Sequence, residues 1–215
     1  MPAMKFVIKP ADSSFEMMLE ANQYRRIWEQ HQTAILEAFR ALTGLEFQQH
    51  LITARVTRGS YGHAGLPGRA MILPGDFSSV ELKTCTLVHE LAHRLLGGNA
   101  LGIVALGLVP NEDIPDPRYQ KFEHRHSYLF QKDVIERAFG AELAQICVRS
   151  EQSTNSADYK DAWDWAMSMD FSQRQRAVER LTALAIPREK WQDMDDNHDP
   201  APRDPDEWYA SLAQN

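Results

Sequence analysis

The segment TLVHELAHRLLGGN, residues 86–99, places two histidines four residues apart in an apolar run, with a glutamate directly after the first. On an α-helix, residues four apart lie on the same face, so the imidazoles of His89 and His93 can point at one ion. The glycines at 97 and 98 are typical of a helix end, and GDFSS, residues 75–79, offers N-cap residues upstream. The segment therefore predicts a helix with both ends marked and two metal ligands on it.

Glu90 supplies a further group that a hydrolytic site needs. Zinc binds imidazole nitrogens in tetrahedral geometry, and a catalytic zinc has three protein ligands and one water. A carboxylate beside the first ligand can reach that water and act as its general base. Three polar side chains on the buried face of an apolar helix would also cost on the order of several kcal/mol without a partner, a cost that a shared metal removes. We therefore predict that His89 and His93 bind Zn²⁺ and that Glu90 is catalytic.

These residues resemble the active-site helix of the zincin metallopeptidases, whose motif is HExxH. The resemblance implies a zinc peptidase in which His89 and His93 are ligands and Glu90 is the catalytic base. It also implies that strands precede this helix and that a helix bearing another ligand follows it. In the metzincin subclass the motif continues as HExxHxxGxxH, but Leu96 and Asn99 occupy the glycine and histidine positions here. The chain is therefore not expected to belong to that subclass.

The third ligand is sought on the helix that the sequence predicts from Pro117 to Phe139. Placing its residues at about 100° per step gives one apolar face, and His126 falls near the centre of that face. His126 is therefore the predicted third ligand, and Glu123, at the edge of the same face, is the second choice. His124 points almost oppositely, among polar residues, and comes third.

Two acidic positions complete the prediction of the site. In the gluzincin subclass the third ligand is a glutamate in the pattern ExxxD, a spacing that Glu112 and Asp116 also have. Pro115 and Pro117 oppose a continuous helix through that pair, so Glu112 is disfavoured. Asp133 lies on the same side of its helix as the predicted third ligand. We expect it to orient one of the two motif histidines by a hydrogen bond.

The predicted fold class is α+β, a mostly helical minimal zincin with a small β-sheet packed on the HExxH helix. The segments MKFVIKP, HLITARVTRG and RAMILPG are predicted strands, and residues 23–43 are a predicted amphipathic helix closed by Gly44. A last helical region covers residues 158–185. It is expected to break near Asp170, where Ser172 and Gln175 could form a capping box.

The composition of the chain limits how many domains it can form and where in the cell it is expected. Its 215 residues, 43% of them hydrophobic, suffice for one domain, predicted at residues 1–187, with an acidic, proline-containing tail at residues 188–215. The longest apolar stretch is too short to span a bilayer, and no cleavable apolar signal core is recognised, so a soluble cytoplasmic protein is expected. Cys85 and Cys147 are far apart and are predicted to be buried free thiols.

The function predicted from the sequence is a small intracellular metallopeptidase that acts on a peptide or protein substrate. A net charge of −7 argues against nucleic acid as a partner, and the oligomeric state is not predicted. A non-catalytic, zinc-stabilised interaction domain derived from a zincin is the alternative. A crosslink-repair protease resembling the SprT-like group is a third hypothesis, which the acidic composition disfavours. The presence of Glu90 favours catalysis, because a purely structural zinc site does not need it.

Overall fold

A computed structural model describes residues 4–59, 62, 70–76, 79–101, 117–154 and 156–186; for residues 117–122 it describes the backbone alone. Six α-helices and three β-strands make up these parts of the chain, which confirms the α+β class. The predicted tail at residues 188–215, the domain boundary before it, and the pair Glu112 and Asp116 lie outside the described residues.

The three strands form one parallel sheet in the order β1-β2-β3: β1 (Lys5–Pro10), β2 (Leu51–Thr57) and β3 (Met71–Pro74). Ile8 is paired with Ala54, and Ala54 with Met71, so these three side chains share one face and are buried there. Leu51 and Arg55, on the other face of β2, are exposed. The sheet therefore has one face in the hydrophobic core, as alternating burial along a strand requires.

Helix α1 (Phe15–Thr43) makes the crossover that two parallel neighbouring strands need. It begins at Ser14, whose hydroxyl accepts a hydrogen bond from the backbone N–H of Met17, and it ends at Gly44, which has a φ of 68°. The sequence predicted only its later part. Its first turns carry exposed apolar side chains, which disturb the inward-facing pattern; these are Phe15, Met18 and Leu19.

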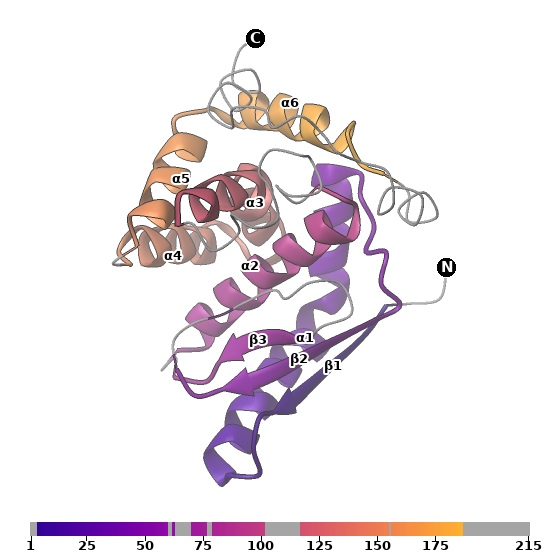
Figure 1. Ribbon diagram of the computed structural model, residues 1–215, viewed down its shortest axis with the longest axis vertical. Helices are drawn as coiled ribbons and strands as arrows, with labels where there is room; N and C mark the ends of the chain where they lie inside the picture. Colours follow the sequence, from indigo (N-terminus) through magenta and orange to yellow (C-terminus); the bar gives the residue numbers. More distant parts are fainter. Residues whose placement is uncertain are drawn as a thin grey trace.

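Helix α2 (Val80–Gly98) carries the HExxH segment, and in Figure 1 it lies between the sheet and the helices that follow it in the chain. The hydroxyl of Ser79, one of the N-cap candidates in GDFSS, caps its start by accepting from the backbone N–H of Leu82 at 3.2 Å. Its end differs from the expectation, because the left-handed residue is Ala100, with a φ of 58°, and not a glycine. Gly98 has a packing role, since a Cβ there would lie 2.9 Å from the side-chain amide of Gln49.

Four further helices complete the described fold: α3 (Pro117–Phe139), α4 (Ala141–Gln152), α5 (Ala157–Met167) and α6 (Phe171–Thr182). Helix α3 has the predicted bounds and packs against α1, α2, α4, α5 and α6. Every residue from His126 to Gln131 is therefore buried. Helix α4 was not predicted, and the capping box of α6 is made by Asp170 and Gln173 instead of Ser172 and Gln175.

A disulfide between Cys85 on α2 and Cys147 on α4 corrects the prediction of free thiols. The two Cα atoms lie 5.5 Å apart, a separation typical of disulfides. The pairing was not predicted because α4 was not recognised from the sequence. Disulfides persist mainly in oxidising compartments, so this bond does not favour the expected cytoplasmic location, which stays a prediction. None of the described helices is both long and apolar enough to cross a bilayer.

A buried ion pair joins α3 to α6. Arg174 donates to both carboxylate oxygens of Asp133, at 2.8 and 3.1 Å, and also to the backbone carbonyl of Met169 at 2.8 Å. Both charged side chains are only 7% exposed. A bidentate pair with this little exposure satisfies two charges that would otherwise be costly to bury.

Removing one partner of this pair should strongly destabilise the protein. We expect Arg174→Met to lower the free energy of unfolding by about 3–5 kcal/mol, because it leaves the carboxylate of Asp133 buried without its partner. Urea unfolding followed by circular dichroism measures the change. Lys160→Met is the matched control, since it breaks the exposed ion pair with Asp164 and should leave stability nearly unchanged. Equal effects in the two variants would contradict the prediction.

Candidate metal centre

The two histidines of the HExxH segment come together on α2 as the helical spacing predicts. Nε2 of His89 lies 3.1 Å from Nε2 of His93, and the two ring centroids are 4.7 Å apart. His89 is 4% exposed, and His93 is half-buried. Two imidazole nitrogens at this distance repel each other through their lone pairs unless a proton or a cation lies between them. The pair is therefore arranged to share a proton or a metal ion.

His124, on α3, completes a group of three. One nitrogen from each of His89, His93 and His124 lies within 4.8 Å of the others, so the group could hold a metal ion. The ring of His124 is 5.3 Å from that of His89 and 5.2 Å from that of His93, centroid to centroid. Three imidazoles suit zinc and also copper, nickel and iron. The donor set thus fits a transition metal without deciding which one.

The structure places His124, and not the predicted third ligand His126, in the histidine group. His126 is fully buried but is not part of the histidine group, and burial lowers the pKa of its imidazole to about 3. The prediction of His126 took the polar stripe of α3 for a solvent-facing surface. Since α3 is buried on several sides, that stripe, with His124, Ser127 and Gln131, is buried as well, and Gln131 reaches His89 on α2.

Glu123, the second choice, lies beside the group and does not join it. Its Oε1 is 3.7 Å from Nδ1 of His93, the ring nitrogen other than the one that faces His89. The side chain of Glu123 is 54% exposed, in contrast to the buried imidazoles. Glu123 therefore marks the side on which this part of the site meets solvent.

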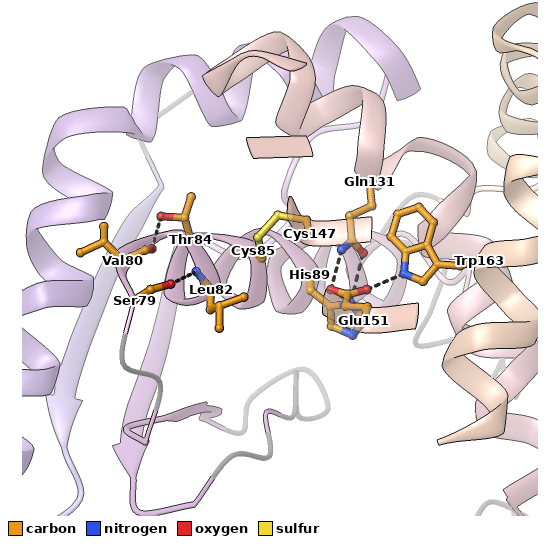
Figure 2. Close-up of a disulfide and its surroundings, with 10 residues drawn as sticks. All are labelled: Ser79, Val80, Leu82, Thr84, Cys85, His89, Gln131, Cys147, Glu151 and Trp163. Atoms are coloured by element: carbon orange, nitrogen blue, oxygen red, sulfur yellow. Dashed lines mark hydrogen bonds and ion pairs between the residues drawn. A yellow bond between two sulfur atoms is a disulfide. The ribbon is translucent and has the colours of Figure 1, made fainter. Parts of the chain in front are cut away.

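Gln131 and Glu151 orient His89, a role that the sequence assigned to Asp133. Nδ1 of His89 lies 3.1 Å from Oε1 of Gln131 and 3.5 Å from Oε1 of Glu151 (Figure 2). Both neighbours are acceptors, so Nδ1 carries a proton and donates it. Nε2 is then the nitrogen that faces the histidine group. Asp133 is instead occupied by its ion pair with Arg174.

The carboxylate of Glu151 has a partner on each oxygen. Nε2 of Gln131 donates to Oε1 at 3.1 Å, and Nε1 of Trp163 donates to Oε2 at 2.7 Å. Burial opposes ionisation, but His89, Trp163 and Tyr128 favour the charged form and lower the pKa of Glu151. Burial likewise opposes protonation of His89, but Glu151 outweighs it and raises the pKa of that imidazole. Glu151 is therefore a carboxylate that stabilises positive charge at His89, whether a proton or a bound metal ion supplies it.

Aromatic rings from α3 and α5 surround the histidines. The ring of Tyr159 lies 4.1 Å from that of His124 and is stacked on His89 at 5.8 Å, centroid to centroid. Tyr128 is stacked on Trp163 at 4.0 Å, and both are fully buried. These rings limit water on one side of the group and strengthen the electrostatic interactions within it. Sequence reasoning missed Glu151 and Tyr159, because no spacing pattern connects them to the HExxH segment.

Glu90 is buried next to the histidine group. It is 3% exposed, and burial raises the pKa of its carboxyl to about 7. A Cβ at Gly62 would lie 2.3 Å from Oε1 of Glu90, so the backbone of residue 62 covers this carboxylate closely. Gly62 is thus a further residue of the site that the sequence alone did not indicate.

Comparisons of this chain with protein-family models, with curated proteins and with solved structures gave no match.

Replacing His124 should distinguish the observed group from the predicted one. We expect His124→Ala to weaken zinc binding by more than about 100-fold, since losing even an outer hydrogen-bond partner of a metal ligand typically costs about 10–100-fold. His126→Ala is the matched control, two residues along the same helix, and should retain one zinc per folded chain. Equilibrium dialysis with metal analysis measures both. Zinc retained in His124→Ala and lost in His126→Ala would restore the original assignment.

Proposed function

We propose that this protein is a zinc-dependent hydrolase, and that it is a metallopeptidase. The observation that carries the proposal is the group of His89, His93 and His124 with the buried carboxylate of Glu90 beside it. Three imidazoles are a donor set of catalytic zinc sites, which leave a fourth position open for water or substrate. A site that only stabilised the fold would not need a buried glutamate next to its ligands.

Each residue has a distinct role in this proposal. His89, His93 and His124 would hold the zinc, which when bound polarises a carbonyl and increases the acidity of water. Glu90 accepts a proton from the water that attacks the scissile carbonyl, and then donates it to the nitrogen of the leaving amine.

The orientation of His89 supports the same proposal. Because Nδ1 donates to Gln131, Nε2 is directed toward the other two histidines, and the three nitrogens converge. The net charge of −7 disfavours a nucleic acid, so a peptide or protein remains the proposed substrate. The non-catalytic zinc domain is the competing proposal. It makes the same prediction for metal binding and the opposite one for hydrolysis.

Glu90→Gln tests the catalytic role directly. We expect peptide hydrolysis to fall by about 10²–10⁴-fold, the usual contribution of a positioned base, while the zinc content stays that of the parent. A library of fluorogenic peptides and metal analysis of the same samples measure the two quantities. Glu81→Gln, an exposed change on the same helix, is the control and should cleave normally.

Two results would contradict this proposal in different ways. Parental cleavage by Glu90→Gln would show that Glu90 is not the base. A parent protein that binds one zinc per chain but cleaves no peptide in the library would support the non-catalytic domain instead. In that case chelation should unfold the protein without removing any activity.

Gly62→Ala tests whether the position of Glu90 matters. The new Cβ would lie 2.3 Å from Oε1 of Glu90 and 3.2 Å from Cγ2 of Thr86, so the carboxylate has to move. We expect kcat to fall by about 10–100-fold with zinc retained, because a displacement of about 1 Å can cost that much. The control is Gly97→Ala, where a Cβ meets nothing within 4 Å. Equal kcat in both variants would show that the covering backbone does not position the base.

A further inference from the structure

We propose that Glu151 is the positioning residue of the metal centre, and that the disulfide between Cys85 and Cys147 holds it against His89. The proposal rests on the metal site of the proposed function. Cys85 lies four residues before His89 on α2, and Cys147 lies four residues before Glu151 on α4. The disulfide and the contact between His89 and Glu151 are therefore stacked about one helical turn apart, as Figure 2 shows.

The disulfide fixes how closely α2 and α4 approach each other next to the site. It holds the Cα atoms of Cys85 and Cys147 at 5.5 Å. One turn further along both helices, Oε1 of Glu151 lies 3.5 Å from Nδ1 of His89. Because side chains four residues apart lie on the same helical face, any separation of the helices at the disulfide also moves Glu151 away from His89.

Besides its direct contact with His89, Glu151 also determines which nitrogen of that ring carries the proton, through the side-chain amide of Gln131. A carboxylate can only accept hydrogen bonds, so the NH₂ group of Gln131 has to face Oε1 of Glu151, at 3.1 Å. The carbonyl oxygen of the same amide then faces Nδ1 of His89, also at 3.1 Å. That oxygen can only accept, so the proton stays on Nδ1 and Nε2 is free for the metal.

A neutral amide at position 151 would remove this constraint. In Glu151→Gln, the new side chain could present its NH₂ group to Gln131, whose amide could then turn and present its own NH₂ group to His89. Nδ1 of His89 would have to accept, and its proton would move to Nε2, the nitrogen that the metal needs. The charge that stabilises a cation at the site would be lost as well.

The key experiment measures the affinity of the full chain for zinc by competition with a chromophoric chelator. We expect Glu151→Gln to weaken zinc binding by about 10–100-fold, the effect typical of losing a hydrogen-bond partner of a metal ligand. The matched control is Glu142→Gln, an exposed glutamate on the same helix, which should bind zinc as the parent does. The absorption spectrum of bound Co²⁺ should change in Glu151→Gln and remain that of the parent in the control.

Exchanging the carboxylate and the amide between positions 131 and 151 distinguishes a positioning role of Glu151 from a role in packing alone. In the double variant Gln131→Glu/Glu151→Gln, the carboxylate at 131 accepts from both His89 and the amide at 151, and the oxygen of that amide accepts from Trp163. The hydrogen bonds between residues 89 and 131, 131 and 151, and 151 and 163 are thereby possible again, with the proton back on Nδ1 of His89. We expect this variant to recover most of the zinc affinity that Glu151→Gln loses, which a loss of packing alone would not predict.

The contribution of the disulfide is tested without touching Glu151. A phosphine reduces the bond with water as the oxygen source: the phosphorus is oxidised to its oxide, and the two sulfurs each gain a proton and become thiols. We expect the reduced protein to bind zinc more weakly than the oxidised protein. Cys85→Ser/Cys147→Ser should behave like the reduced protein, which excludes new thiolate ligands as the cause.

The outcomes separate this proposal from the proposed function. Parental zinc affinity in Glu151→Gln would overturn the role of Glu151, and parental affinity in both the reduced protein and the serine variant would overturn that of the disulfide. A parent that binds no zinc would overturn the metal site and this proposal together. A parent that binds zinc tightly and hydrolyses nothing would overturn the proposed function alone, and the effect of Glu151→Gln on affinity would still support the positioning role.

Discussion

The cost of burying ionisable side chains in the middle of the molecule governs what surrounds α2. His89, Glu90 and Arg94 are all at most 4% exposed, on a helix from which Leu87, Leu91, Leu95 and Leu96 enter the hydrophobic core. An unpaired charge in such surroundings is expensive, so the neighbouring elements must supply hydrogen-bonding groups. Gln131 and Glu151 do so for His89. The apolar residues of α2 fix the helix against the sheet and α1, and its polar residues determine which side chains α3 and α4 can carry.

Much of the fold could be predicted because residues close to each helix end determine where the helix begins and stops. Ser79 caps α2, while Pro117 and Gly140 mark the limits of α3; each of these residues acts through its own backbone or side chain, whatever the tertiary structure. Helix α4 is different. It has only 12 residues, its N-cap residue Gly140 forms no side-chain cap hydrogen bond, and its buried residues are few, namely Ala144, Cys147 and Val148. Its position depends on packing against α3 and on the disulfide to α2.

In the candidate site, too, some residues could be predicted from local sequence and others depend on tertiary packing. His89 and His93 could be paired from sequence because one helical turn joins them, whatever the rest of the chain does. The choice between His124 and His126 instead depends on how many helices pack around α3. A helix with one buried face directs its apolar stripe inward, but a helix enclosed by several others can also bury a polar stripe if that stripe lines a polar site. A single sequence does not say which of these two cases applies.

The disulfide has one more consequence, which concerns the unfolded chain. It joins residues 62 positions apart, and all three histidines of the metal group lie within the loop that it closes. A metal bound by them would close a smaller loop inside the larger one. Closing an inner loop costs less conformational entropy once the outer ends are joined. Oxidation and metal binding therefore restrict the same freedom of the chain, so their stabilising effects are not additive, and whichever cross-link forms first reduces the entropic benefit of the second.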